Sequence, residues 1–284
     1  MLHSLAALPN MSGGSMLASF IEMMQYDFIQ RAFFAGLIIS ICAALIGSSL
    51  VLRRQSMIGD GLSHVAFGAV AIAIAFGWAP LEFSIIAAII AAFFILRLNE
   101  NSKVNGDAAI AILSASALAL GTFIVSVKGV NIDLNAYLFG SILAISAHDL
   151  IVCLVLGVVI IAVFAILHRQ IFAITFDETF AKSIGIKVDL YQSILSVLCA
   201  VTTVIGMKML GALLISSLII FPCLSAMQLS RTFRQNIIIS VIVSIICFIG
   251  GLIASYVFAT PTGATIVLVN LCVFLLCFIY NKLR

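Results

Sequence analysis

A short polar run, RRQSMIGDGLSH at residues 53–64, lies between two strongly apolar stretches. It contains two arginines, a glycine-aspartate-glycine turn, and His64 four residues after Asp60. If the chain is helical from about residue 58, Asp60 and His64 lie side by side on one helix face. A carboxylate and an imidazole form half of a four-ligand site for Zn²⁺, or a sparse site for Mn²⁺. The alternative is that Asp60 only caps a helix beginning at Gly61, while His64 hydrogen-bonds to a neighbouring helix.

A second polar segment, HRQIFAITFDETFAKSIGIKVD, covers residues 168–189. Asp177 and Glu178 are favourable at the start of a short helix, Lys182 falls one turn later, and Gly185 is placed to end it. A short amphipathic helix outside the membrane indicates a docking site for a partner. The alternative is an ordinary solvated connector.

The composition sets the class of protein that must position these residues. Hydrophobic residues make up 64% of the chain, charged residues 9%, and the mean hydropathy is +1.30. A soluble domain of this size cannot bury so many apolar side chains, so we predict an all-α, polytopic membrane protein. The net charge of +3 is small and its lysines and arginines are scattered, so we expect no nucleic-acid partner. The seven cysteines form no C-x-x-C pair and are interpreted as packing residues.

Eight apolar runs are long enough to serve as membrane spans, for which about 20 residues are needed. They cover residues 32–52, 61–79, 107–127, 149–167, 190–206, 209–229, 236–257 and 263–280. A ninth, shorter run covers residues 81–96, and we predict nine spans in all. The segment 130–147 carries Asp133 and two asparagines, so we predict that it is re-entrant. Residues 1–30 contain no Lys or Arg and read as a loose extension rather than a signal peptide. Residues 31–284 then form a single transmembrane domain.

The basic residues predict the orientation of these spans. When the loop holding Arg53 and Arg54 is placed in the cytoplasm, alternate loops put all but three of the 14 Lys and Arg residues on that side. The exceptions are Arg31, Lys128 and Lys208. Nine spans then place the N-terminus outside and the C-terminus inside.

This orientation predicts the outcome of a reporter experiment. A reporter fused after Arg284 should report a cytoplasmic location, and one fused near Asn10 should report an external one. An enzyme reporter that is active on only one side of the membrane measures both. Two fusions with the same location would contradict an odd number of spans.

Motifs that are absent from the sequence argue against an enzyme. There is no G-x-x-x-x-G-K-[ST] for ATP, and none of the four histidines is followed by glutamate, as a zinc protease requires. An intramembrane aspartyl protease needs a second aspartate in a span and a glycine where Met57 stands. We therefore expect no catalytic residues and no cofactor.

Several blocks of the sequence resemble the signature blocks of a known family and occur in the same order along the chain. They are RRQSMIGDGLSHVAFGAV, LNAYLFGSILAIS, FDETFAKSIGI, MKMLGALLISSLIIFPCLSA and SYVFATPTGATIVL. Together they resemble the membrane permease subunit of ATP-binding-cassette (ABC) importers for zinc, manganese or iron, of the zinc-uptake type. The resemblance extends from about residue 31 to the C-terminus.

The resemblance implies a role for each polar segment. Asp60 and His64 would line the translocation path, and a two-fold axis would bring together the pairs of two permeases. Asp177, Glu178, Ala181 and Gly185 would form the helix that couples the permease to two cytoplasmic ATPases. An extracytoplasmic metal-binding protein would deliver the ion. The implied architecture is the vitamin B12 permease fold without its first helix, in a bacterial cell membrane.

The cargo is the least determined part of this interpretation. The imidazole favours zinc, which we predict, whereas the carboxylate tolerates manganese, and iron(II) import by the same machinery is an alternative. A permease for an organic chelate such as a siderophore or cobalamin needs a wide apolar pore without ligands, so the Asp60–His64 pair argues against it.

Overall fold

The computed structural model describes residues 24–101, 106–129 and 146–283. Within this part of the chain, nine helices are long and apolar enough to span a membrane, and there is no β-strand. The nine are α2 (Asp27–Leu52), α3 (Met57–Phe76), α4 (Pro80–Asn101), α5 (Gly106–Lys128), α7 (Ala147–Ile166), α10 (Val188–Leu210), α11 (Ala212–Leu229), α12 (Phe233–Phe258) and α13 (Thr262–Leu283). Two short helices, α8 (His168–Phe176) and α9 (Glu178–Ser183), connect α7 to α10. The predicted all-α membrane bundle is confirmed.

Two predicted boundaries differ from the observed ones. The first span begins at Asp27 rather than at residue 32, and Asp27 carries a favourable negative charge in the first turn. Residues 27–30 of the predicted extension are therefore helical, and residues 1–23 lie outside the described residues. Most of the predicted re-entrant segment, residues 130–145, also lies outside them. Its last two residues begin α7, where the Ser146 and Asp149 side chains form a capping box.

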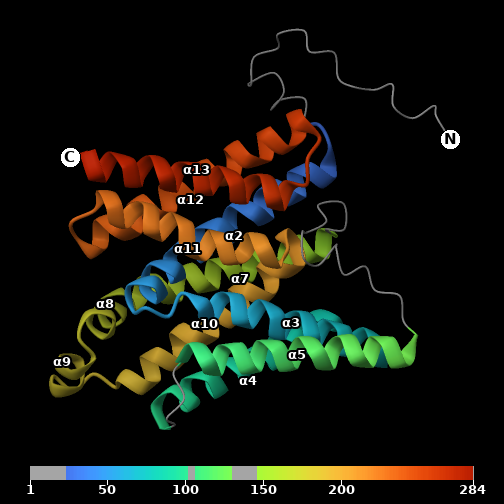
Figure 1. Cartoon of the computed structure of the whole chain (residues 1–284), viewed down its shortest axis with the longest axis horizontal. Helices are drawn as coiled ribbons and strands as arrows, with labels where there is room; N and C mark the ends of the chain where they lie inside the picture. Colours follow the sequence, from blue (N-terminus) through green and yellow to red (C-terminus); the bar gives the residue numbers. More distant parts are fainter. Residues whose placement is uncertain (1–23, 102–105, 130–145, 284) are drawn as a thin grey trace.

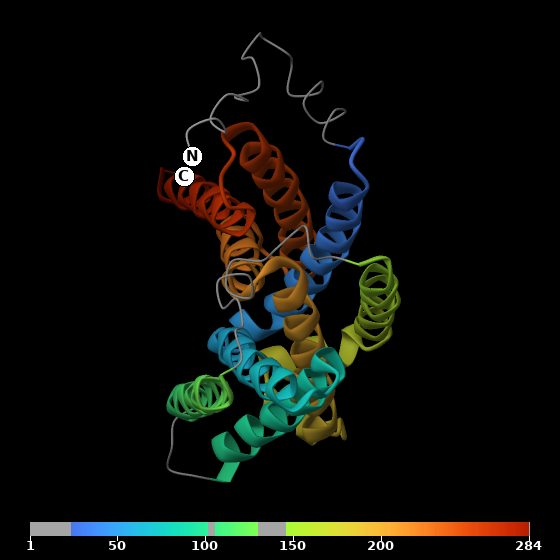
Figure 2. The same cartoon turned by 90° about the vertical axis from the view of Figure 1, so that its right-hand side faces the viewer.

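The helices form two groups on either side of α2 and α10. Helices α3, α4 and α5 pack together on one side, and α11, α12 and α13 pack together on the other (Figure 2). α2 contacts α7, α10, α11 and α12, while α10 contacts α2, α3, α4 and α11. Helices α2, α3 and α10 are accordingly among the most buried spans.

The elements that were predicted to be cytoplasmic from the distribution of basic residues lie at one end of the bundle. The turn between α2 and α3, the helices α8 and α9, and the end of α13 all lie at the left of Figure 1. The start of α2 lies toward the opposite end. The described spans therefore follow the alternation that the orientation requires.

Glycines allow the close approach of α3 and α5. A methyl group on Gly68 would collide with the backbone carbonyl of Ala117, and one on Gly121 would lie 2.7 Å from the Gly68 Cα. Because both obstacles are backbone atoms, a side-chain rotation cannot relieve either collision. This packing fixes α3, which carries Asp60 and His64.

We expect Gly68→Val to destabilise the folded protein by about 3 kcal/mol or more, since overpacking against backbone forces the two helices apart. Gly250→Val is the matched control, because Gly250 also lies inside a span but a methyl group there meets nothing within 4 Å. Thermal unfolding of both variants in detergent measures the difference. Equal melting temperatures would show that α3 and α5 tolerate separation.

Candidate functional site

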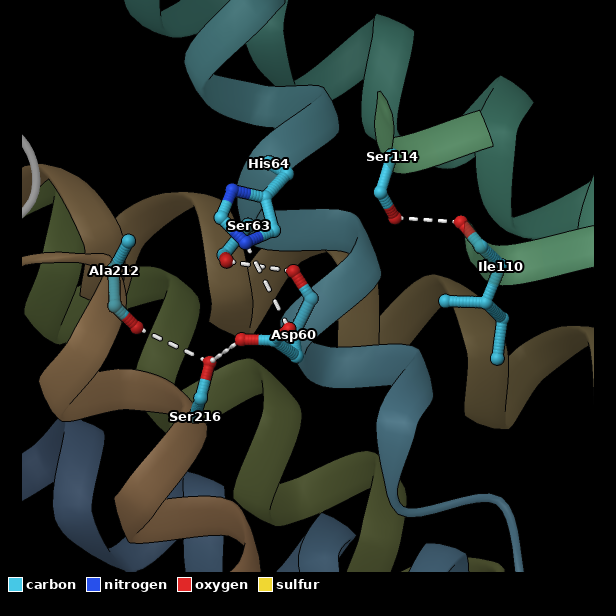
Figure 3. A network of polar contacts seen from close by, with 7 residues as sticks. All are labelled: Asp60, Ser63, His64, Ile110, Ser114, Ala212 and Ser216. Atoms are coloured by element: carbon cyan, nitrogen blue, oxygen red, sulfur yellow. Dashed lines mark hydrogen bonds and ion pairs between the residues drawn. The ribbon is translucent and has the colours of Figure 1, made fainter. Parts of the chain in front are cut away.

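Asp60 and His64 lie one turn apart on α3, as the sequence predicted. The distance from His64 Nε2 to Asp60 Oδ2 is 3.7 Å, and the side chains are 32% and 38% exposed, respectively (Figure 3). Neither is buried, although α3 is among the most buried spans. A carboxylate and an imidazole therefore share one accessible patch on the face of a span.

The alternative in which Asp60 caps a helix is wrong. α3 begins at Met57 after Ser56, so Asp60 lies within the first helical turn rather than before it. The predicted glycine-aspartate-glycine turn is also wrong, because residues 59–61 are helical. The role of both glycines is packing: a methyl group on Gly59 would lie 2.7 Å from the Ile219 side chain, and one on Gly61 would collide with Ile110.

Ser216 holds the Asp60 carboxylate and was not identified from the sequence. Its hydroxyl lies 3.0 Å from Asp60 Oδ1 and 3.1 Å from the backbone carbonyl of Ala212, so a single donor serves two acceptors (Figure 3). Ser216 is in the first turns of α11, 156 residues from Asp60 in the chain. The contact joins α11 to α3 at the acidic side chain.

His64 makes no hydrogen bond to a neighbouring helix within the described residues. Its Nδ1 atom is buried and has no hydrogen-bond partner there, while Nε2 faces Asp60. A histidine that served only to pack a core normally has its polar atoms satisfied. The alternative of a structural histidine is therefore not supported by its contacts.

The described residues of one chain do not form a complete metal site. Among the described residues, no group of three or more His, Cys, Asp or Glu side chains is close enough to hold an ion. The Asp60–His64 pair thus offers two strong ligands, and a four-ligand site needs further ligands from elsewhere. The structure confirms that Asp60 and His64 are neighbours on one helix face, and their role as a metal half-site stays a prediction.

If Asp60 and His64 bind a metal ion as predicted, Ser216→Ala should weaken metal uptake without abolishing it. The variant removes one neutral hydrogen bond to the carboxylate, worth about 1 kcal/mol, so we expect a roughly five-fold rise in the metal concentration that gives half-maximal uptake. The neighbouring Ser217→Ala is the control, because the Ser217 hydroxyl bonds to the Leu214 carbonyl instead. Equal concentration dependence in the two variants would show that Ser216 does not position Asp60.

The second polar segment, residues 168–189, contains the capped helix α9, which lies at the same end of the bundle as the basic loops. Asp177 is the N-cap of α9, and its Oδ1 accepts a hydrogen bond of 2.8 Å from the Phe180 N–H. Lys182 donates to Glu178 Oε1 at 3.0 Å. Gly185 follows the helix with φ +85°. The predicted start and stop of the helix are confirmed, and Lys182 lies one turn after Glu178 as expected.

The short helix α9 is anchored and yet exposed. Ala181 is fully buried and packs with Ile174 and Val188. Phe180 and Ile184 are exposed on its other side. Apolar side chains that lie outside the spans and face away from the bundle are typical of a contact surface for a partner.

Comparisons with known proteins agree with this architecture. Residues 25–281 match the family described as ABC 3 transport family. The chain is 35% identical over 269 residues to a membrane protein encoded in the ycf23-apcF intergenic region of Cyanophora paradoxa, covering 93% of this chain and 90% of that protein. It is 30% identical over 263 residues to the manganese transport system membrane protein MntC of Halalkalibacterium halodurans, covering 92% and 90%.

A solved structure extends the agreement to the fold. The structure described as PsaBC from Streptococcus pneumoniae in complex with Fab superposes with a TM-score of 0.83 at 31% identity, covering 92% of this chain and 95% of that chain. The family match covers almost all of the described residues and includes both polar segments. This multi-pass membrane protein belongs to the ABC 3 transport family.

Proposed function

We propose that this chain is the permease subunit of an ABC importer that carries Mn²⁺ into the cell, with Asp60 and His64 as transient ligands of the ion. The observation that carries the proposal is the accessible Asp60–His64 pair on a buried span of a member of this family. Ionisable groups inside a membrane span are costly and are generally functional.

Manganese replaces zinc as the favoured cargo. The sequence pointed to zinc because of the imidazole, whereas relatives that are 30% identical are named for manganese transport. The surroundings of His64 are rich in oxygen, with the Asp60 carboxylate and the Ser216 hydroxyl close by. Oxygen ligands suit Mn²⁺ better than they suit zinc. Zinc remains the second candidate because of the His64 nitrogen, and iron(II) is compatible with the same ligands.

The incomplete set of ligands fits a transient site on a translocation path better than a site that retains its ion. A transported ion must bind well enough to enter and weakly enough to leave. Two copies of the chain related by a two-fold axis would place two carboxylates and two imidazoles around the ion. The same pair argues against an organic chelate as cargo, because a chelated metal has no need of protein ligands along its path.

The missing P-loop and the exposed side of α9 indicate which partners the chain needs. The sequence has no P-loop, so ATP hydrolysis must take place on a separate ATPase. The exposed side of α9, with Phe180 and Ile184, is where that ATPase would dock. A metal-binding protein on the outer side would deliver the ion to the opposite end of the bundle.

The test is transport of labelled manganese and labelled zinc by proteoliposomes that contain the permease, its ATPase and its binding protein. We expect ATP-dependent manganese transport, and inhibition of that transport by zinc, which binds the same ligands more tightly. Zinc transport at a higher rate than manganese transport would assign zinc as the cargo. A complex that moves neither ion would contradict the proposed function.

A further inference from the structure

An ion pair links α9 to the turn that leads into α3. Arg53 Nη2 lies 3.6 Å from Glu178 Oε2, while the other oxygen of Glu178 accepts from Lys182. The turn between α2 and α3 and the helix α9 both lie at the left end of the bundle in Figure 1. The carboxylate of Glu178 therefore connects the α9 helix to a segment 125 residues earlier in the chain.

This pair differs from an ordinary surface salt bridge because its arginine is buried, although Glu178 is 44% exposed. The Arg53 side chain is only 7% exposed, and Glu178 is its only ion-pair partner among the described residues. Burial lowers the pKa of the Arg53 guanidinium, and the charge of Glu178 opposes that shift. Arginine still remains charged near neutral pH. Breaking the pair would leave an uncompensated buried cation, so Arg53 and Glu178 have a strong reason to stay together.

The turn that carries Arg53 is rigid. The Arg54 N–H donates to the Val51 carbonyl at 3.0 Å, and the Gln55 N–H donates to the Leu50 carbonyl at 2.9 Å. These two hydrogen bonds are the pair that defines a Schellman motif. Arg54 occupies the left-handed position, with φ +59°, where glycine is usual. A turn closed in this way moves with the helices that it joins rather than bending between them.

The same turn leads directly to the metal ligands. Gln55 accepts a hydrogen bond of 3.2 Å from the Ile58 N–H, which attaches the turn to the first residues of α3. Asp60 lies in that first helical turn and contacts Ser216 of α11. A displacement of α9 thus has a short, continuous route to the contact between Asp60 and Ser216.

We propose that Arg53 is a positioning residue that transmits movement of α9 to α3 and so to the Asp60–Ser216 contact. The inference rests on the proposed function, because it takes α9 as the docking helix of an ATPase. When the ATPase moves α9, Glu178 carries Arg53 with it, and the rigid turn shifts the start of α3 relative to α11. ATP hydrolysis is thereby linked to the arrangement of the metal ligands.

The test measures the number of metal ions transported per ATP hydrolysed in proteoliposomes of the complete complex. Arg53→Gln and Glu178→Gln should each lower this ratio about ten-fold while the ATPase still co-purifies with the permease. The exchange Arg53→Glu with Glu178→Arg should restore at least half of the ratio, since it recreates the pair in reverse. Arg54→Gln is the matched control: it removes the adjacent exposed charge and should leave the ratio unchanged.

Two outcomes would overturn the inference. One is a normal ratio in Arg53→Gln, which would show that α3 does not depend on the pair. The other is loss of ATPase binding in Arg53→Gln, which would make Arg53 a docking residue. The ratio is measured with Mn²⁺, or with Zn²⁺ if the wild-type complex carries only that ion. Failure of the proposed cargo therefore appears in the wild type, and failure of the inference appears only in the variants.

Discussion

Asp60→Asn is expected to reduce metal uptake to background in membranes matched for permease content. Asparagine keeps an oxygen that can accept the Ser216 hydrogen bond, and Asp60 is not the cap of α3, so the helix and its contact with α11 should survive. What the variant removes is the negative charge that offsets the lost hydration of a divalent cation. In a paired permease, every substitution is present twice. Unimpaired folding with no uptake is therefore the expected combination.

His64→Ala should have the same effect, because it removes the proposed nitrogen ligand. Uptake of labelled manganese and zinc measures both variants, and the elution profile in detergent reports on folding. Ser63→Ala is the control: Ser63 lies between the two proposed ligands in the chain, but its hydroxyl donates to the Asp60 backbone carbonyl at 2.7 Å and not to the carboxylate. Normal uptake by well-expressed Asp60→Asn would show that the ion passes without this carboxylate.

The spans and the Asp60–His64 pair were predictable because both depend on local sequence. Length and apolarity define a membrane helix, and a spacing of four residues places two side chains on one face whatever the rest of the fold does. The α9 helix was predictable for the same reason, since its N-cap, its ion pair and its terminal glycine lie within nine residues.

The contacts that complete the site were not predictable, because they join distant segments. Ser216 lies in an apolar span in which several serines are equivalent by sequence, and only the packing of α11 on α3 selects it. The Arg53–Glu178 pair depends in the same way on where α9 folds back. The turn at Arg54 could not be predicted from the sequence, because an arginine occupies the left-handed position at which glycine usually marks the end of a helix. The predicted turn at 59–61 failed because glycine also serves close helix packing.

Gly185→Val is expected to uncouple ATP hydrolysis from transport by straining the backbone at the end of α9. Gly185 has φ +85°, and its N–H donates to the Lys182 carbonyl while the Ile186 N–H donates to that of Ala181, so it closes α9. A methyl group at this position meets nothing within 4 Å, which excludes a collision inside the chain. The left-handed conformation costs a side chain about 1–2 kcal/mol, and a β-branched residue tolerates it least. For a helix of six residues, this cost is enough to distort the surface that it presents.

Two further variants separate strain at α9 from strain in general. Gly185→Asn should retain most of the coupling, because asparagine adopts the left-handed conformation more readily than valine. Gly77→Val introduces similar strain at φ +71°, also with nothing within 4 Å, but it lies at the opposite end of α3 and should leave coupling intact. Metal transported per ATP hydrolysed, together with co-purification of the ATPase, measures all three variants. If Gly185→Val and Gly77→Val lowered the ratio equally, the defect would reflect a general loss of stability, and the shape of α9 would have no special part in coupling.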